Sequence, residues 1–414
     1  MLNRIWIAFV LFAFAAASWQ ALHGDVEVFA RLLTALFDSA KTSFDIALGL
    51  VGLMSLWLGV MKVGERGGLI EALARLLAPF FRCIFPAIPP GHPASGSIAM
   101  NFSANLLGLD NAATPLGLKA MRELQEINPQ KTVASDPMLM FLVLNTAGIT
   151  LIPTSVIAIR QSLALKQGLV GFNAADIFLP TLLATFVSFT AGLIAVARWQ
   201  RINLLCRPVL VFFAGFAALL AGLYLWLGGL PPEEMARAMG ALGSGTVLAI
   251  IGLFVGVAAW RGVDVYASFV EGAKDGFNVA IQIVPYLVAM LAAIALFRAS
   301  GGMGWLVEGI AWGVRGLGLN TDFVPALPVG LMKTLSGSGA RGLMVDVMTT
   351  YGVDSFAGRL AAIIQGSTET TFYVLAVYFG SVGITQTRYA VAGGLIADAV
   401  GLVGAILIGY AFYH

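Results

Sequence analysis

The chain has 414 residues, of which 59% are hydrophobic and 11% are charged. Soluble domains carry roughly 25% charged residues, so the composition excludes an ordinary soluble protein and indicates an integral membrane protein that crosses the bilayer many times. The net charge of +2, without a run of basic residues, gives no support for a nucleic-acid partner. Because backbone groups in lipid must be satisfied locally, we expect an all-α polytopic membrane protein.

Nine apolar runs approach the length of about 20 residues that a membrane-spanning helix needs. They cover residues 5–22, 46–63, 138–159, 178–198, 208–228, 245–260, 279–297, 357–380 and 388–410. The first run also resembles a signal peptide, because Arg4 precedes a short apolar stretch that ends in small residues near Ala17. We expect it to be retained as a helix, since modest thinning of the bilayer accommodates a short span.

Two further apolar stretches, residues 92–125 and 324–350, are interrupted near their middles by Gly, Ser, Asn and Pro. Each predicts a re-entrant hairpin, which is tolerated where its tip lies in protein or water. In both halves of the chain a long span precedes an amphipathic stretch, a hairpin, a span with a polar interruption and a final span. This order predicts a repeat, with units at 1–205 and 263–414 joined by scaffold spans at 206–262.

The distribution of basic residues predicts an orientation, with Arg4 and the N-terminus in the cytoplasm. An odd number of spans then places the acidic loop at 231–234 and the C-terminus outside. In this arrangement the span at 46–63 runs inward and the span at 279–297 runs outward. The two repeats are therefore predicted to have inverted topology.

A polar segment, QGSTETT at residues 365–371, interrupts the span at 357–380. A carboxylate at membrane depth has a high energetic cost, so Glu369 is predicted to take up a proton or to bind a coupling cation. The neighbouring polar side chains are candidate substrate ligands: Gln365, Ser367, Thr368 and Thr370. The alternative is a structural ion pair between Glu369 and a basic residue of a neighbouring helix, such as Arg341.

The first half carries a matching interruption inside the span at 138–159, where Asn145, Thr146 and Thr150 are candidate substrate ligands. Paired interruptions in two halves are typical of transporters built from repeats, whose broken helices form a site near the middle of the membrane. Asp398, within the last apolar run, is a second candidate ion-coupling acid.

The first hairpin carries further candidate ligands. Asn101 and Asn105 are four residues apart, so they share one face of a helix. Asp110, Asn111 and Thr114 lie at its tip, where the returning helix would offer free N–H groups to a polar ligand. The alternative is that the tip residues only cap the helix and turn the chain.

The second hairpin contains Ser336 and Ser338, which alternate with glycines over residues 336–339. Such a segment lets the backbone approach a ligand closely and can form a small anion-binding nest, although a flexible turn explains it equally well. The three histidines have no catalytic or metal-binding neighbours, so we expect neither an enzyme nor a metal site. Cys83 and Cys206 lie far apart without metal-type spacing and are expected to be ordinary thiols.

Two motifs carry a family resemblance. Residues 105–121, NLLGLDNAATPLGLKAM, resemble a signature of spore maturation protein A, and residues 335–342 and 365–374 resemble segments of spore maturation protein B. The chain is thus similar to a fusion of these two proteins, which belong to the Gate, or nucleoside recognition, family. That family resembles the hairpin-bearing modules of concentrative nucleoside transporters and ferrous iron transporters. The resemblance implies two re-entrant hairpins and two broken helices in a bacterial inner-membrane protein.

One departure from those nucleoside transporters concerns the tip of the first hairpin. The resemblance implies an acid before the small residues and the proline, whereas residues 111–115 read NAATP and lack it. This difference argues against a nucleoside as substrate.

These observations predict a secondary active transporter of a small polar metabolite, such as an amino acid, a nucleoside or an organic anion. We expect coupling to H⁺ or Na⁺ and no other cofactor. The expected partners are the substrate and membrane lipid, with a homodimer or homotrimer as the assembly. Two alternatives stay open, namely a non-transporting structural or regulatory module of the cell envelope with a sporulation-type role, and a divalent metal permease.

Overall fold

The computed structural model describes residues 2–108, 110–227 and 232–414. Within these ranges the regular elements are helices, and the only strand-like contact is an isolated bridge between Val133 and Gln386. Helices suit a polytopic chain because each satisfies its own backbone hydrogen bonds inside lipid. The predicted all-α class is therefore confirmed.

The helices of the first half are α1 (Leu2–Leu22), α2 (Val28–Arg66), α3 (Leu69–Ile84), α4 (Pro93–Leu106), α5 (Asp110–Glu126), α6 (Asp136–Thr146), α7 (Thr154–Lys166), the 3-10 turn η1 (Ala174–Ile177) and α8 (Phe178–Gln200). Two helices follow, α9 (Arg207–Leu227) and α10 (Pro232–Trp260). The second half contains α11 (Val265–Ala299), α12 (Gly302–Gly316), the 3-10 turn η2 (Val324–Ala326), α13 (Leu327–Lys333), α14 (Gly337–Tyr351), α15 (Phe356–Ser367), α16 (Thr371–Ser381) and α17 (Ala390–Tyr413).

The two halves show the same order of elements. Each has a long helix (α2, α11), a shorter helix (α3, α12), a helical hairpin (α4–α5, α13–α14), a broken helix (α6–α7, α15–α16) and a final helix (α8, α17). Capping sets several starts, because the Ser336 and Ser355 hydroxyls accept the N–H groups of Gly339 and Gly358, at 3.1 Å and 3.0 Å. The breaks coincide with the predicted polar interruptions.

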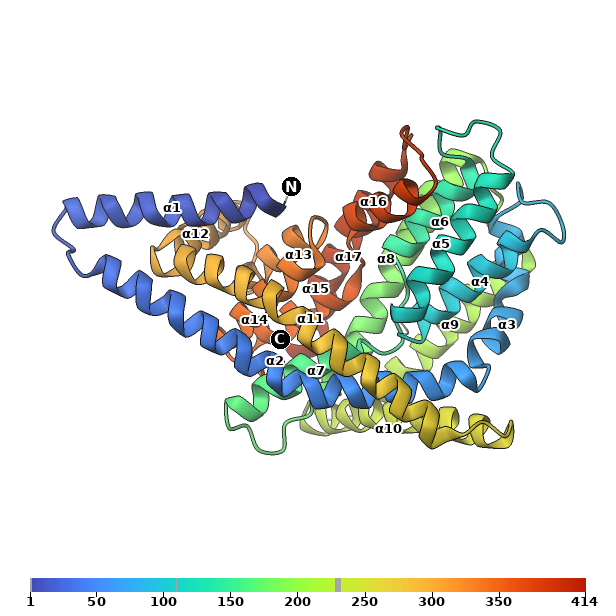
Figure 1. Ribbon diagram of the computed structural model, residues 1–414, viewed down its shortest axis with the longest axis horizontal. Helices are drawn as coiled ribbons and strands as arrows, with labels where there is room; N and C mark the ends of the chain where they lie inside the picture. Colours follow the sequence, from blue (N-terminus) through green and yellow to red (C-terminus); the bar gives the residue numbers. More distant parts are fainter. Residues whose placement is uncertain (1, 109, 228–231) are drawn as a thin grey trace.

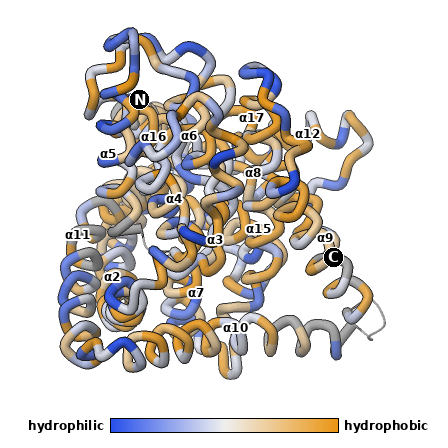
Figure 2. Tube along the Cα trace, turned by 90° about the vertical axis from the view of Figure 1, so that its right-hand side faces the viewer, coloured by the Kyte–Doolittle hydropathy of each residue, from blue (hydrophilic) through white to orange (hydrophobic). Residues whose placement is uncertain are grey.

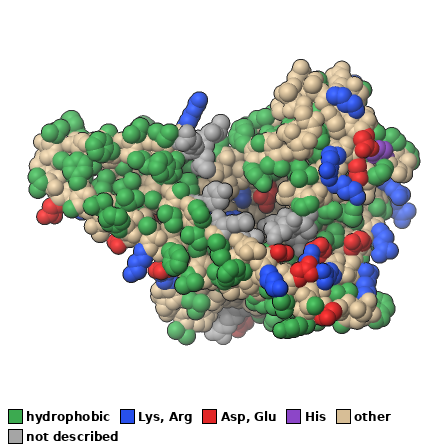
Figure 3. Space-filling view, viewed as in Figure 1, with side chains coloured by type: hydrophobic (Ala, Val, Ile, Leu, Met, Phe, Trp, Pro, Cys, Tyr) green, Lys and Arg blue, Asp and Glu red, His purple; other side chains and the backbone are tan. Residues whose placement is uncertain are grey.

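Figure 1 shows how these elements are arranged. Helices α1, α2 and α12 extend to one side as an arm, whereas α4, α5, α6 and α8 stand next to one another at the other side. Helix α10 lies below the upright helices in this view and again in Figure 2, where hydrophobic residues are spread along most helices. The visible surface of the arm is largely hydrophobic, and charged side chains gather over the opposite side (Figure 3). A lipid-facing arm fits this distribution.

Six helical segments in the described part of the chain are long and apolar enough to cross a membrane, and a seventh results if α11 and α12, bent by 73°, count as one span. The six are Arg4–Leu22, Val28–Arg66, Ala174–Gln200, Ala241–Trp260, Phe356–Ser381 and Ala390–Tyr413. The chain is therefore a multi-pass membrane protein. The predicted run at 138–159 is divided into α6 and α7, and the run at 208–228 lies only partly within the described residues, so the number of nine is not reached.

Helices α2 and α11 pack against each other along much of their length, and glycines allow the close approach. Gly272 and Gly276 are four residues apart on α11, the spacing at which small residues let two membrane helices meet. A Cβ atom on Gly276 would lie 2.6 Å from the backbone carbon of Met54 and from the Cα of Ser55 on α2. The backbone, which cannot rotate away, fills the space next to this glycine.

Gly276→Ala is therefore expected to destabilise the protein by about 1–3 kcal/mol, the usual cost of forcing a methyl group into a filled interface. Thermal unfolding in detergent would measure the effect. Gly256→Ala on α10 is the matched control, because no atom lies within 4 Å of the added Cβ. Equal unfolding temperatures for the two variants would contradict the close contact between α2 and α11.

Cys83, near the end of α3, and Cys206, just before α9, form a disulfide with Cα atoms 6.6 Å apart. The expectation of ordinary thiols was wrong. The two residues are 123 positions apart, and sequence spacing gives no sign of a pairing that depends on how distant helices pack.

We predict that the denatured, unreduced protein takes up no maleimide and that the reduced protein takes up two, as measured by mass spectrometry. Labelling of both cysteines before reduction would contradict the disulfide.

Candidate functional site

The two broken helices meet at their breaks. Helix α6 ends at Thr146, and the chain between α15 and α16 passes directly beside it. The backbone N–H of Glu369 donates a hydrogen bond to the Thr146 carbonyl oxygen at 2.7 Å. The two polar interruptions, more than 200 residues apart in sequence, thus form one continuous polar region.

Each hairpin contacts the broken helix of its own half in the same way. In the first half the Leu151 N–H donates to the Leu106 carbonyl at the tip of the hairpin, at 2.8 Å. In the second half the Phe372 N–H donates to the Thr334 carbonyl, at 3.2 Å. Gly108 makes the first contact possible, because its φ of +74° and the Ile152 oxygen, 2.8 Å from where a Cβ would be, both disfavour a side chain.

A cavity of about 300 Å³ opens where the first hairpin faces both breaks. It is lined by Asn105, Ala113, Thr114, Asn145, Glu369, Tyr373, Val374, Val377 and Tyr378. Its wall therefore contains one carboxylate, two amides, a threonine hydroxyl and two tyrosines. Such a wall can bind a small polar molecule by hydrogen bonds and aromatic contact.

The predicted substrate ligands Asn105, Thr114 and Asn145 line this cavity together with the predicted ion-coupling residue Glu369. The Asn105 amide donates to the Asn145 side-chain oxygen at 3.1 Å, and the Asn145 amide donates to the Phe141 carbonyl at 2.9 Å. These bonds fix the orientation of both amides before a ligand arrives. Glu369 is exposed, which differs from the dry environment expected for it, because its side chain faces the cavity.

Several other predicted ligands have structural contacts instead. Asn101 is buried and donates to the Ala113 carbonyl at 2.7 Å, so it joins the two limbs of the first hairpin. Ser336 caps α14 and lies 3.2 Å from the Ser338 hydroxyl, and Ser367 donates to the Ile364 carbonyl at 2.8 Å. None of these residues lines the cavity described above.

The remaining predicted residues surround the breaks. Buried side chains belong to Thr146, Gln365, Thr368 and Thr370, and Thr150 is half-buried. The side chains of Asp110 and Asn111 lie outside the described residues. Asp398 is buried in α17, does not line the cavity and accepts a hydrogen bond from the Thr371 hydroxyl at 2.5 Å.

Sequence reasoning missed the aromatic and aliphatic part of the cavity wall, which comes from α16. Tyr373 and Val377 follow Glu369 at intervals of four residues, and Val374 and Tyr378 repeat this interval one position later. This helical spacing was the available signal. Tyr378 also packs against the Phe141 ring, with ring centroids 5.7 Å apart.

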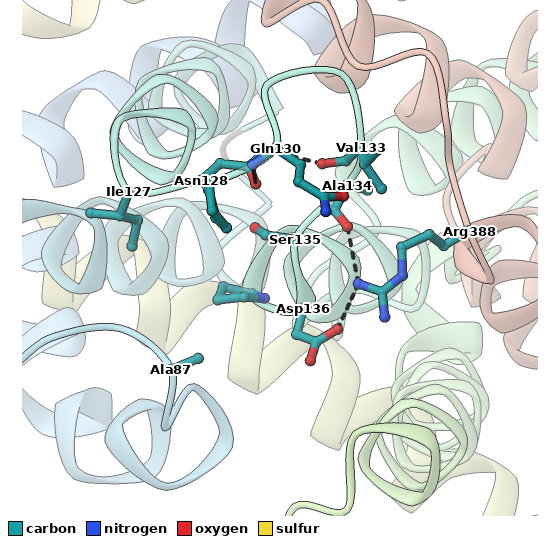
Figure 4. Close-up of a pocket in the computed structure, with 11 residues that line it drawn as sticks. Ala87, Ile127, Asn128, Gln130, Val133, Ala134, Ser135, Asp136 and Arg388 are labelled. Atoms are coloured by element: carbon teal, nitrogen blue, oxygen red, sulfur yellow. Dashed lines mark hydrogen bonds and ion pairs between the residues drawn. The ribbon is translucent and has the colours of Figure 1, made fainter.

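A second pocket, of about 380 Å³, lies at the start of α6 beside the loop that follows α5 (Figure 4). Arg388 donates to the Asp136 carboxylate at 2.8 Å and to the Ala134 carbonyl at 3.1 Å. The two charged side chains that line this pocket are thus paired with each other, and neither broken helix contributes its break to the wall. We regard the cavity at the breaks as the candidate site.

Comparison with known proteins matches one segment in each half of the chain. The Gate family, described as nucleoside recognition, matches residues 47–163 and 280–385. The chain belongs to the Gate family. The matched segments contain both hairpins and most of both broken helices, so every residue that lines the cavity lies within the Gate regions.

Two relatives from Bacillus subtilis (strain 168) are similar to parts of this Gate protein. Spore maturation protein A is 40% identical over 194 residues, which cover 47% of this chain and 93% of the relative. Spore maturation protein B is 45% identical over 146 residues, which cover 35% of this chain and 80% of the relative. The chain thus combines an A-like and a B-like protein in one polypeptide, as the resemblance of its motifs implied.

Proposed function

We propose that the chain is a secondary active transporter that moves a small polar metabolite through the cavity at the breaks. The observation that carries the proposal is the origin of the cavity wall. Asn105 and Asn145 come from the first half and Glu369 from the second, so both halves form one polar site. Broken helices that meet around a polar site are typical of transporters built from repeats.

The charge of the cavity wall supports a neutral or positively charged substrate. Glu369 is the only charged residue among those that line the cavity in the described part of the chain. An anion would meet this carboxylate without a compensating basic group. An organic anion is therefore the least suitable of the three predicted classes.

An amino acid and a nucleoside fit the same wall in different ways. The amino group of an amino acid would pair with Glu369, whereas a nucleoside would place its base against Tyr373 or Tyr378 and its polar edge towards the two amides. The cavity volume of about 300 Å³ is at the lower end of the usual range for small-molecule sites. This size favours a compact substrate.

The shared order of elements supports two repeats. We propose further that the repeats have inverted topology, that the chain lies in a bacterial inner membrane and that it assembles as a homodimer or homotrimer. Alternating access would move the hairpins and broken helices against the scaffold spans of residues 206–262. Transport of the substrate would be coupled to the movement of H⁺ or Na⁺.

We place the N-terminus in the cytoplasm and the C-terminus outside, following the distribution of basic residues. This orientation puts Arg82 and Arg207 in the cytoplasm, and each is next in sequence to a cysteine of the Cys83–Cys206 disulfide. Disulfides persist in oxidising compartments, so the disulfide favours the outside for this end of α3. The distribution of basic residues and the disulfide thus favour opposite orientations. A membrane-impermeant thiol reagent, applied to intact cells after mild reduction, distinguishes them, because it reaches Cys83 only if the end of α3 faces outside.

A second candidate function is a non-transporting structural or regulatory module of the cell envelope with a sporulation-type role. The names of the two relatives support the part of this alternative that concerns spore maturation. A divalent metal permease has less support, because no group of three or more His, Cys, Asp or Glu residues that could hold a metal occurs in the described part of the chain.

Thermal unfolding of the purified protein with a panel of amino acids, nucleosides and organic anions tests the proposal, with and without Na⁺ and at two pH values. A substrate that binds the folded state raises the unfolding temperature by mass action. At a concentration of 100 times its dissociation constant, it adds about 2.7 kcal/mol to the free energy of unfolding. We expect one neutral or cationic class to do so. Stabilisation by no compound, together with a reproducible protein partner, would favour the envelope module instead.

A further inference from the structure

Asp398 is an acid that the substrate cavity does not use. It lies within α17, is 5% exposed and is absent from the cavity wall. It also lies outside both segments that match the Gate family. A carboxyl group so deep in an apolar helix is costly and calls for a specific role.

The two oxygens of the Asp398 carboxyl have different surroundings. Oδ2 accepts a hydrogen bond from the Thr371 hydroxyl at 2.5 Å. Oδ1 is fully buried and has no hydrogen-bond partner in the described part of the chain. A half-satisfied, ionised carboxylate in such a place loses much of its hydration without replacement.

Helix α17 holds this carboxyl tightly against the second break. A Cβ on Gly394 would lie 2.6 Å from the Cγ2 of Thr371, and one on Gly401 would lie 2.9 Å from the Cγ2 of Thr368. The helix therefore contacts the break directly on both sides of Asp398. The carboxyl group is thus in direct contact with the start of α16, the helix that carries much of the cavity wall.

Two charged groups act on Asp398 from the elements around it. Lys333, at the end of α13, is 7% exposed and attracts the carboxylate, whereas Glu369, in the break, repels it. The ammonium group of Lys333 offsets the charge of Asp398 when the acid is ionised, and proton uptake removes that charge. A divalent cation would need several oxygen ligands, whereas this site offers one carboxylate and one threonine hydroxyl under the influence of a lysine.

We infer that Asp398 is a proton-binding site separate from the substrate cavity, and that the Thr371 hydroxyl links its protonation to the position of α16. The role that we give to this proton rests on the proposed transport function, whereas the experiment that tests the site does not need a substrate. A proton on Asp398 makes the carboxyl a donor and weakens its hydrogen bond with the Thr371 hydroxyl, so the start of α16 is held less firmly against α17. A proton and a substrate that both favour one position of α16 bind cooperatively.

Infrared difference spectroscopy of the purified protein, recorded against pH without substrate, tests this site. We expect a band of a buried protonated carboxyl group in the wild type, lost in Asp398→Asn and kept in Glu369→Gln. Thr371→Val removes the hydroxyl that stabilises the ionised form, so proton affinity should rise about tenfold. Thr349→Val is the matched control, because that hydroxyl donates only to the Val345 carbonyl of its own helix.

Loss of the band in Glu369→Gln but not in Asp398→Asn would overturn the inference. So would the absence of any such band together with stabilisation by Na⁺ that depends on Asp398, because the site would then bind sodium. If Asp398→Asn does not fold, Thr371→Val decides, since it keeps the carboxyl. If the band depends on Asp398 but no substrate is found, the proton site is supported and the transport proposal is not.

Discussion

Glu369→Gln is expected to lower the affinity for substrate by about 10- to 100-fold. A hydrogen bond to a charged group contributes about 1.5–3 kcal/mol, and the exchange removes the one charge among the described residues of the cavity wall while keeping the shape of the side chain. The fold should be unaffected, because the side chain is exposed and the contact of residue 369 with Thr146 is made by its backbone N–H. Titration of the unfolding temperature with the stabilising compound would measure the change.

Glu308→Gln is the control for this prediction. Glu308 is also an exposed glutamate, but it lies on α12, pairs with Arg315 and does not line the cavity. It should bind the compound as the wild type does. Equal affinities for all three proteins would show that Glu369 does not contact the substrate.

Asp176→Asn is expected to destabilise the protein by about 3–5 kcal/mol, the usual cost of leaving a buried charge without its partner. Asp176 pairs with Arg160, whose side chain is fully buried, and also accepts from Arg359 at 3.1 Å. Without the carboxylate, two guanidinium groups face each other, and the remaining contacts of Arg160 are the Ala174 carbonyl and the Phe172 ring. Unfolding in denaturant would measure the loss.

Asp354→Asn provides a matched control, because Asp354 also pairs with Arg359 but is 57% exposed. An exposed pair contributes about 0–1 kcal/mol, so this variant should be close to the wild type. The double change Asp176→Asn and Arg160→Met should recover part of the lost stability, since it removes the unpaired buried cation. A cost below about 1 kcal/mol for Asp176→Asn would show that the network contributes little.

The breaks were predictable because their chemistry is local. Asn145–Thr146 and Gln365–Thr371 interrupt apolar runs, and α6 and α15 end within these segments. The number of spans was less predictable, because a polar break in the sequence does not show whether the two helix halves still cross the membrane as one span. The α15–α16 pair counts as one span, whereas the α6–α7 pair does not. The Cys83–Cys206 disulfide could not be foreseen either, since it depends on where α3 and α9 lie in space.

The sequence alone determined that this is an all-helical, multi-pass membrane protein of the Gate type with polar breaks in both halves. These properties depend on composition and on the order of residues along the chain. The tertiary structure decided which polar residues share a site. It turns Glu369 into the cavity and buries Asp398 against Thr371 at the start of α16, although both acids lie in apolar runs. The position of an acid within an apolar run predicts its depth in the membrane. Helix rotation and packing decide whether its side chain faces a cavity or a neighbouring helix.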